Sequence, residues 1–84
     1  MINVIGSKYH GDYRIMVWFN AGAECRILDF EPILRKSENP DVRELLDKEK
    51  FKQFHIEHGG LCWDNNALSL SARSLWFGDY LNTT

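Results

Sequence analysis

The sequence predicts a single small α+β domain over residues 1–84, with strands and helices in the order β-β-β-α-β-β and a short C-terminal helix. In this fold an antiparallel sheet of about five short strands packs against a helix on one face. Two pairs of β-rich segments each flank a glycine-containing turn, as β-hairpins do. A segment that opens with proline and carries an apolar stripe separates the pairs. The chain is 44% hydrophobic and 13% aromatic, which suits one compact core.

The first three strands are expected at residues 2–5, 13–19 and 24–30, where β-branched and aromatic residues concentrate. A turn at residues 10–12 separates the first two strands. The Asn-Ala-Gly sequence at residues 20–22 predicts a three-residue hairpin loop between the second and third strands.

This hairpin loop fixes the register in which the second and third strands pair. It sets Ile15 opposite Ile27. It also sets Val17 opposite Cys25, so that one face is wholly apolar and is expected to meet the core. The opposite face then carries Arg14, Met16, Trp18, Arg26 and Leu28.

These five residues form the candidate interaction surface that the sequence offers. Large apolar groups that stay exposed usually mark a contact surface. Trp, Met and Arg are also enriched in protein interfaces. Two interpretations stay open: the face meets another protein, either a second copy or a neighbouring gene product, or the chain's own first strand or last helix covers it.

A helix is expected to begin at Pro40, with Asn39 as its N-cap, and a short helical turn is expected to precede it at Glu31-Pro32. Its apolar stripe extends after a small kink, and its members are Val42, Leu45, Leu46, Phe51 and Phe54. A last helical turn is expected from a Ser71 cap to Phe77, with Gly78 ending it.

Residues 55–57 and 61–64 predict a second hairpin around Gly59-Gly60. A two-residue turn there sets Glu57 opposite Cys62. It also sets His55 opposite Asp64, as a cross-strand ion pair.

The sequence indicates no metal ligands, cofactor-binding residues or catalytic residues. His55 and His58 are three residues apart, and an odd spacing in a strand sends side chains to opposite faces. Neither a CxxC nor an HExxH spacing is present, and no phosphate-binding loop is found. Cys25 and Cys62 are expected as ordinary buried thiols, although a bridge between them stays open.

The overall charge argues against direct binding to nucleic acid. Ten Lys and Arg against twelve Asp and Glu give a net charge of −2, and no basic stripe is evident. No stretch of about 18 apolar residues or signal-like leader is found, so we expect no membrane association and a cytoplasmic location.

Several segments, in their order and spacing, resemble the small bacterial proteins grouped as domain of unknown function 2442. The strand and glycine turn VWFNAG at residues 17–22 resemble a family motif, as does the following strand RILDF at residues 26–30. Further matching positions are Leu45 and Phe51, the Trp-Asp-Asn of residues 63–65, and the Leu-Trp of residues 75–76. The sequence departs from the family where a glycine usually follows the asparagine, because Asn66 stands there.

The resemblance implies a compact α+β fold without established catalytic residues. Such domains occur alone, fused to helix-turn-helix segments, or encoded beside another small protein in a toxin–antitoxin-like pair. We therefore expect a non-enzymatic protein-interaction or regulatory module. Membership of such a gene pair is one form of this role, and it is implied by the resemblance alone. The alternatives are a nucleic-acid-associated regulator that acts through a partner, and a small hydrolase built on Asp29, Asp64 or His55.

Overall fold

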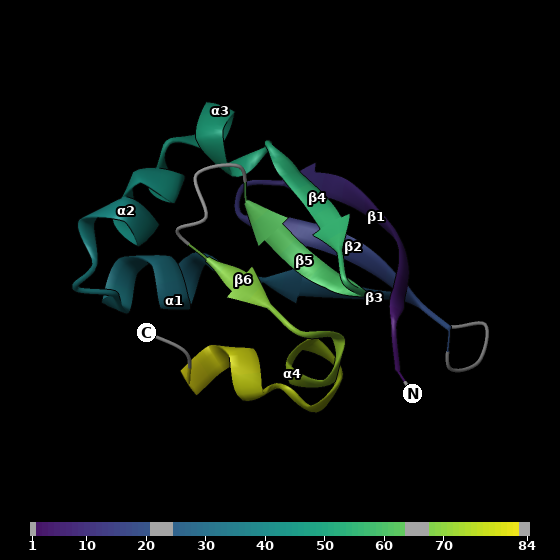
Figure 1. Cartoon of the computed structure of the whole chain (residues 1–84). Coiled ribbons are helices and arrows are strands. Elements are labelled where there is room, and N and C mark those ends of the chain that lie inside the picture. Colours follow the sequence, from purple (N-terminus) through teal and green to yellow (C-terminus); the bar gives the residue numbers. More distant parts are fainter. Residues whose placement is uncertain (1, 21–24, 64–67, 83–84) are drawn as a thin grey trace.

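The computed structural model describes residues 2–20, 25–63 and 68–82 (Figure 1). Two three-stranded antiparallel sheets and several short helices make up these residues, so the predicted α+β class is confirmed. The single sheet of about five strands is wrong in detail, because the strands divide into the orders β1-β2-β3 and β4-β5-β6.

The first sheet contains β1 (Val4–Gly11), β2 (Arg14–Phe19) and β3 (Cys25–Asp29). Strand β1 continues well beyond the predicted residues 2–5. It can do so because Gly11 and Asp12 adopt the left-handed conformations, with φ of +108° and +49°, that turn the chain directly into β2.

The predicted register between β2 and β3 is wrong by one residue. Ile15 lies opposite Leu28, and Met16 lies opposite Ile27. A slip of one residue transfers every side chain of a strand to the other face. Because of this slip, Leu28 faces the core in place of Ile27. Leu28 is buried at 7% exposure, whereas Ile27 is 49% exposed.

The gain in buried apolar volume explains this register. Leu28 and the following Phe30 enter the core, whereas the predicted pairing would have placed Ile27 and the smaller Cys25 there. The loop sequence was a poor guide to the register, and residues 21–24 lie outside the described part of the chain.

The second sheet contains β4 (Phe54–Glu57), β5 (Gly60–Trp63) and a short β6 (Ser69–Leu70) that the sequence did not predict. The turn between β4 and β5 is formed by His58 and Gly59, both with positive φ, as in a type I′ hairpin. The turn therefore falls one residue earlier than predicted.

This turn shifts the predicted β4–β5 register by two residues, which leaves the faces unchanged because side chains alternate with a period of two. His55 lies opposite Cys62, not Asp64, and Glu57 lies opposite Gly60. Asp64 falls outside the described residues.

The expected continuous helix is broken into short turns. The helical turn at α1 (Glu31–Lys36) is confirmed, and so is α2 (Pro40–Arg43) with its Asn39 cap. The chain then forms the 3₁₀ turn η1 (Glu44–Leu46) and the separate helix α3 (Lys48–Phe51).

Asp47 causes the break between η1 and α3. Its backbone is extended, and its side chain accepts a hydrogen bond from the Glu49 amide to cap α3. Phe54, predicted to continue the helical stripe, instead begins β4.

The last helix, α4 (Ala72–Phe77), is as predicted. The Ser71 hydroxyl accepts a hydrogen bond from the Ser74 amide at 3.1 Å, and Gly78 ends the helix with φ of +82°. A 3₁₀ turn, η2 (Asp79–Asn82), follows. None of the helices in the described ranges is long and apolar enough to cross a membrane.

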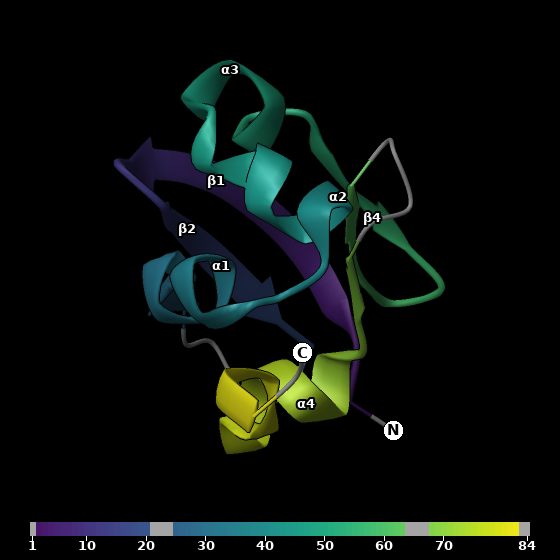
Figure 2. The same ribbon diagram turned by 90° about the vertical axis from the view of Figure 1, so that its left-hand side faces the viewer.

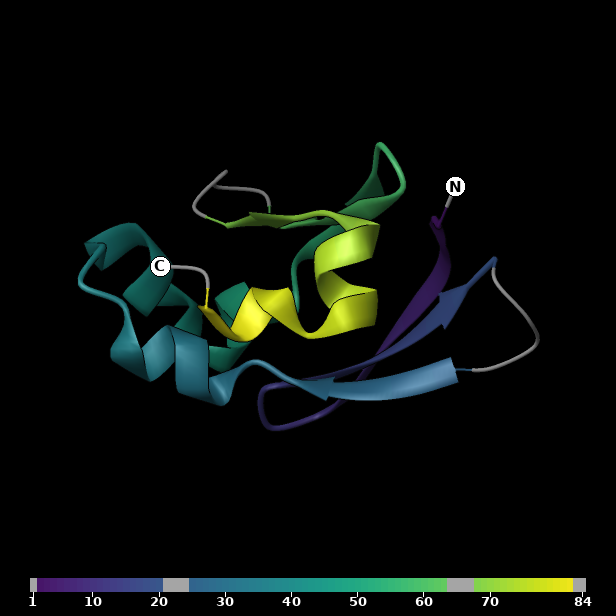
Figure 3. The ribbon, with the colours of Figure 1, turned by 90° about the horizontal axis from the view of Figure 1, so that it is seen from below.

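The two sheets form two layers around a common core, seen edge-on in Figure 3. The start of β1 joins them, because the Val4 amide donates a hydrogen bond to the Gly59 carbonyl at 2.8 Å. Helices α1 to α3 close one end, which faces the viewer in Figure 2, and α4 lies along one side. The predicted helix on one sheet face is thus replaced by helices at the end and side of the layers.

Aromatic residues dominate the core between the layers. The indole N–H of Trp63 is fully buried and donates a hydrogen bond to the Phe51 carbonyl at 2.8 Å. The Phe51 ring contacts Tyr13 edge to face, and the Tyr13 hydroxyl donates to the Leu46 carbonyl. The polar atoms of Trp63 and Tyr13 therefore each have a partner, which lowers the free-energy cost of burying them.

Candidate functional site

The face of β1-β2-β3 that points away from the core is the first candidate site. Figure 3 shows no described element beneath this sheet. Its side chains alternate with the core-facing ones along each strand. We call this surface the outer face, and its members are Lys8, Arg14, Met16, Trp18, Cys25, Ile27 and Asp29.

The centre of the outer face is apolar and only partly covered. Ile27 is 49% exposed, and Met16 and Trp18 are half-buried. The Trp18 ring lies across Gly6 of β1, with its Cε3 atom 3.5 Å from the position of a Cβ at Gly6. Ile5, the extra residue of an irregularity in β1, is 66% exposed beside this row.

Three of the five predicted interface residues lie together on this face, namely Arg14, Met16 and Trp18. The other two do not. Leu28 is in the core at 7% exposure, and Arg26 lies on the inner face opposite Val17.

The position of Arg26 is explained by α4. Its guanidinium donates a hydrogen bond to the Trp76 carbonyl at 2.8 Å and lies 4.0 Å from the centre of the Trp76 ring. Trp76 in turn packs edge to face on Phe19. Arg26 therefore ties α4 to the first sheet and is not a surface anchor.

A second candidate site lies on the outward face of β4 and β5, which sequence reasoning missed. His55, Glu57 and Cys62 each offer a ligand atom there, and these three atoms lie within 4.8 Å of one another. The His55 Nε2 atom is 3.1 Å from a Glu57 carboxylate oxygen. Cys62 is buried, whereas the His55 and Glu57 side chains are 42% and 50% exposed. The predicted burial is therefore right for Cys62 and wrong for Cys25, which is exposed because it projects from the outer face.

The electrostatics of this cluster favour an ionised Glu57. The hydrogen bond from His55 lowers the pKa of Glu57 from its ordinary value of 4.5, and the nearby His58 and Cys62 act in the same direction. The His58 Nε2 atom is 3.6 Å from the second carboxylate oxygen. The carboxylate is thus held between two imidazoles and a thiol.

The signal that could have revealed the cluster is the dipeptide His58-Gly59. A two-residue type I′ loop favours glycine at its second position, which places the turn at these residues and pairs His55 with Cys62. Gly60 is required for a different reason. A Cβ there would lie 2.2 Å from the Leu70 carbonyl oxygen, so Gly60 lets β6 approach β5.

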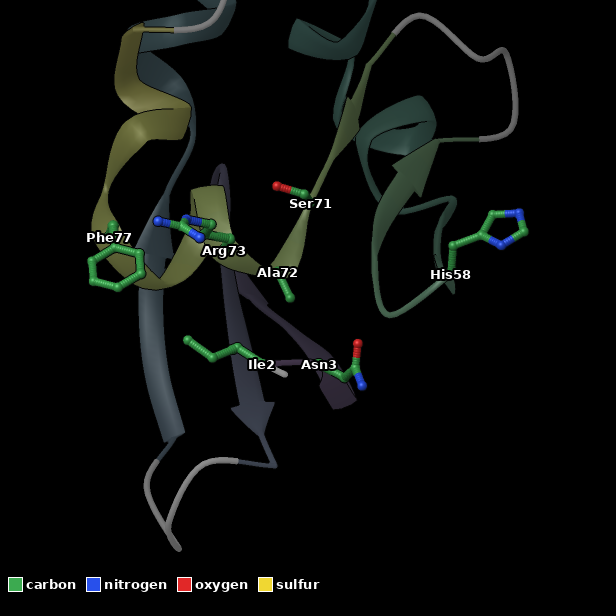
Figure 4. A pocket seen from close by; sticks show the side chains of 7 residues that line it. All are labelled: Ile2, Asn3, His58, Ser71, Ala72, Arg73 and Phe77. Carbon is green, nitrogen blue, oxygen red and sulfur yellow. The ribbon is translucent and has the colours of Figure 1, made fainter.

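Two cavities border the second sheet. One, of about 410 Å³, lies beside Cys62 and is also lined by Glu57, Ser69 and Leu70. The other, of about 680 Å³, lies between the N-terminal segment and α4 (Figure 4).

The larger cavity has a mixed lining of apolar and polar side chains. Ile2, Ala72 and Phe77 line it together with Arg73, whose guanidinium lies 5.5 Å from the centre of the Phe77 ring. The His58 ring at its border points away from the others in Figure 4. Of the polar residues that line it, His58 contacts the Glu57 carboxylate and Ser71 caps α4.

Of the three residues of the hydrolase alternative, the two that the structure describes, Asp29 and His55, are not brought together. Asp29 ends β3 and accepts a hydrogen bond from the Glu31 amide at 3.0 Å, at the start of α1. His55 belongs to the other sheet and contacts Glu57. Asp64 lies outside the described residues.

Comparison with known proteins shows the family of the chain. The family profile described as protein of unknown function (DUF2442) matches residues 4–80. The chain belongs to the DUF2442 family. The match begins with the first residue of β1 and ends within η2, so it includes both sheets and the helices α1 to α4 that the structure describes in this DUF2442 protein. No curated protein and no solved structure matches the chain. The function of this DUF2442 protein is therefore inferred from its own surfaces.

Proposed function

We propose that this DUF2442 protein is a non-enzymatic protein-interaction module whose contact surface is the outer face of β1-β2-β3. The observation that carries the proposal is the exposed apolar centre of this face, where Ile27 is 49% exposed beside half-buried Met16 and Trp18. Removing apolar surface from water stabilises an association by about 25 cal/mol per Å². A sheet face with this composition is suited to recognition by another protein.

The proposed occupant is a second copy of the same chain. The polar residues of the outer face are arranged for self-recognition, because Lys8 lies on β1 and Asp29 lies on β3, on opposite sides of β2. A two-fold axis along β2 would stack β1 of one copy over β3 of the other. Lys8 of one copy would then lie over Ile27 of the other, within reach of Asp29.

The same axis brings the central strand against itself. Met16 and Trp18 both belong to β2, so each would lie near its own counterpart in the second copy. Stacked sheets approach to about 10 Å, which suits side chains of this size. Because the face is only three strands wide, we expect a weak dimer with a dissociation constant in the micromolar range.

The test is the molar mass of the protein in solution, measured by light scattering up to about 1 mM, where a micromolar dimer is almost fully assembled. We expect the wild-type protein to dimerise and Ile27→Glu to remain monomeric with an unchanged circular dichroism spectrum. The matched control is Phe77→Glu, because Phe77 is also an exposed apolar residue, at 61%, but belongs to α4. This variant should dimerise as the wild type does.

Two results would overturn the proposal. One is a wild-type protein that stays monomeric at the highest concentration, which would also be the result if the face met only a different protein. The other is an Ile27→Glu variant that dimerises as well as Phe77→Glu.

A further inference from the structure

We propose that the outward face of the β4–β5 hairpin binds one divalent cation of the zinc class, with the His55 Nε2 atom, the Cys62 thiolate and the Glu57 carboxylate as ligands. This site is separate from the outer face of the first sheet. Its basis is the convergence of three different ligand types on one small surface, with their ligand atoms within 4.8 Å of one another.

The hairpin geometry produces this convergence. His55 and Cys62 are directly opposite on adjacent antiparallel strands, and Glu57 follows His55 by two residues on the same strand. Residues two apart in a strand share a face, so all three side chains project from one side of the sheet.

The spacing of the ligand atoms is close to that of a bound ion. Zinc lies about 2.0–2.3 Å from nitrogen, oxygen and sulfur ligands in a tetrahedron, so two of its ligand atoms are about 3.3–3.6 Å apart. The His55 nitrogen and the Glu57 oxygen are already 3.1 Å apart. To bind one ion, the His55 and Glu57 ligand atoms must also move closer to the Cys62 sulfur. Their side chains are exposed and can change rotamer at low cost.

The frame that holds the thiol is rigid. Cys62 is 6% exposed, and its neighbours Leu61 and Trp63 are fully buried on the opposite face of β5. The buried Cys62 sulfur therefore has a fixed position, and the exposed His55 and Glu57 side chains can adjust to bind the same ion. The cavity of about 410 Å³ beside Cys62 leaves room for a water molecule as the fourth ligand.

The ligand types select the class of cation. A thiolate together with imidazole suits zinc and similar transition metals, whereas magnesium and calcium prefer oxygen ligands alone.

The experiment is a titration with Co²⁺, which reports thiolate ligation through a charge-transfer band and tetrahedral geometry through intense visible bands. The protein should carry Cys25→Ala, because Cys25 is an exposed thiol elsewhere on the molecule and would bind metal on its own. We expect one equivalent of Co²⁺ to give both signals and one equivalent of Zn²⁺ to abolish them.

Substitutions test each ligand in the same Cys25→Ala background. Cys62→Ala should remove the charge-transfer band, and His55→Ala and Glu57→Gln should each weaken binding by about 100-fold or more, beyond the loss typical of residues that only orient a ligand. The two exposed positions keep the test valid should Cys62→Ala fold poorly. His10→Ala is the matched control, since His10 is an exposed histidine of β1, and it should bind as the parent does.

Several outcomes would overturn the proposal. They are the absence of a charge-transfer band at one equivalent of Co²⁺, a band that survives Cys62→Ala, and equal binding by His55→Ala and His10→Ala. Calcium or magnesium displacing Co²⁺ as effectively as Zn²⁺ would also contradict it.

Discussion

His55 and Cys62 lie directly opposite one another on β4 and β5, although the predicted turn at Gly59-Gly60 would have set Cys62 opposite Glu57. The turn at His58 and Gly59 decides this pairing. The same register gives Glu57 two histidine neighbours, and the chemistry of the second sheet follows from it.

The titration of Glu57 is the first prediction. Its folded pKa lies below 4.5, so the stability that its ionised form contributes is present above pH 4.5 and is lost as the pH falls through the folded value. His55→Ala should move the pKa of Glu57 back toward 4.5, because the hydrogen bond from His55 is the largest cause of the shift. A carboxyl-detected NMR titration in metal-free buffer measures it. A wild-type Glu57 that titrates at 4.5 or above would contradict the account.

Gly60 tests the approach of β6 to β5. In Gly60→Ala the new Cβ would lie 2.2 Å from the Leu70 carbonyl oxygen, so the strands must separate. We expect a loss of about 1–3 kcal/mol in the free energy of unfolding, measured with urea. Gly6→Ala is the control, because its Cβ would be 3.5 Å from Trp18 in ordinary contact, and its cost should stay within about 0.5 kcal/mol. Equal losses in the two variants would refute the proposed cause.

Phe51 tests the aromatic core. It is fully buried and contacts the rings of Tyr13, Phe30 and Trp63. Phe51→Ala should cost about 3–5 kcal/mol of unfolding free energy, since it leaves a cavity among these rings. Phe77→Ala should cost no more than about 0.5 kcal/mol, because Phe77 is exposed. Thermal and urea unfolding measure both losses. A small loss of unfolding free energy in Phe51→Ala would contradict a core centred on this ring.

Lys8 tests the charge arrangement of the proposed dimer. Lys8→Glu replaces attraction toward Asp29 of the second copy by repulsion, and a rim charge of this kind is worth about 0.2–1 kcal/mol. We expect the dissociation constant to rise a few-fold and the wild-type dimer to weaken with added salt. A dimer that tightens in Lys8→Glu would contradict the two-fold arrangement.

Local signals in the sequence were sufficient for the helix ends. The Asn39 cap with Pro40, and the Ser71 cap with Gly78, depend on hydrogen bonds and backbone preferences within a few residues. The break at Asp47 was missed because its extended backbone interrupts a stripe that still reads as helical. Capping by Asp47 outweighed that periodicity.

The strand registers could not be predicted from local sequence signals. The β2–β3 pairing is set by which residues reach the core, Leu28 and Phe30 in place of Cys25, and this depends on the opposing layer. Of the candidate surface, Met16 and Trp18 were predicted because they belong to β2, whose faces do not depend on the register. Arg26 was assigned to the wrong face because the faces of β2 alone do not determine the register of β3.

The three tryptophan indoles provide the most direct measurement of the central claim, which is that the outer face meets a second copy. Trp18 lies on that face, Trp63 is bonded to the Phe51 carbonyl in the core, and Trp76 is stacked under Arg26. In nitrogen–proton NMR spectra recorded from about 1 mM down to the low micromolar range, we predict that the Trp18 indole signal shifts with dilution while the other two stay constant. A Trp18 signal that does not move, or a Trp76 signal that moves instead, would contradict the account.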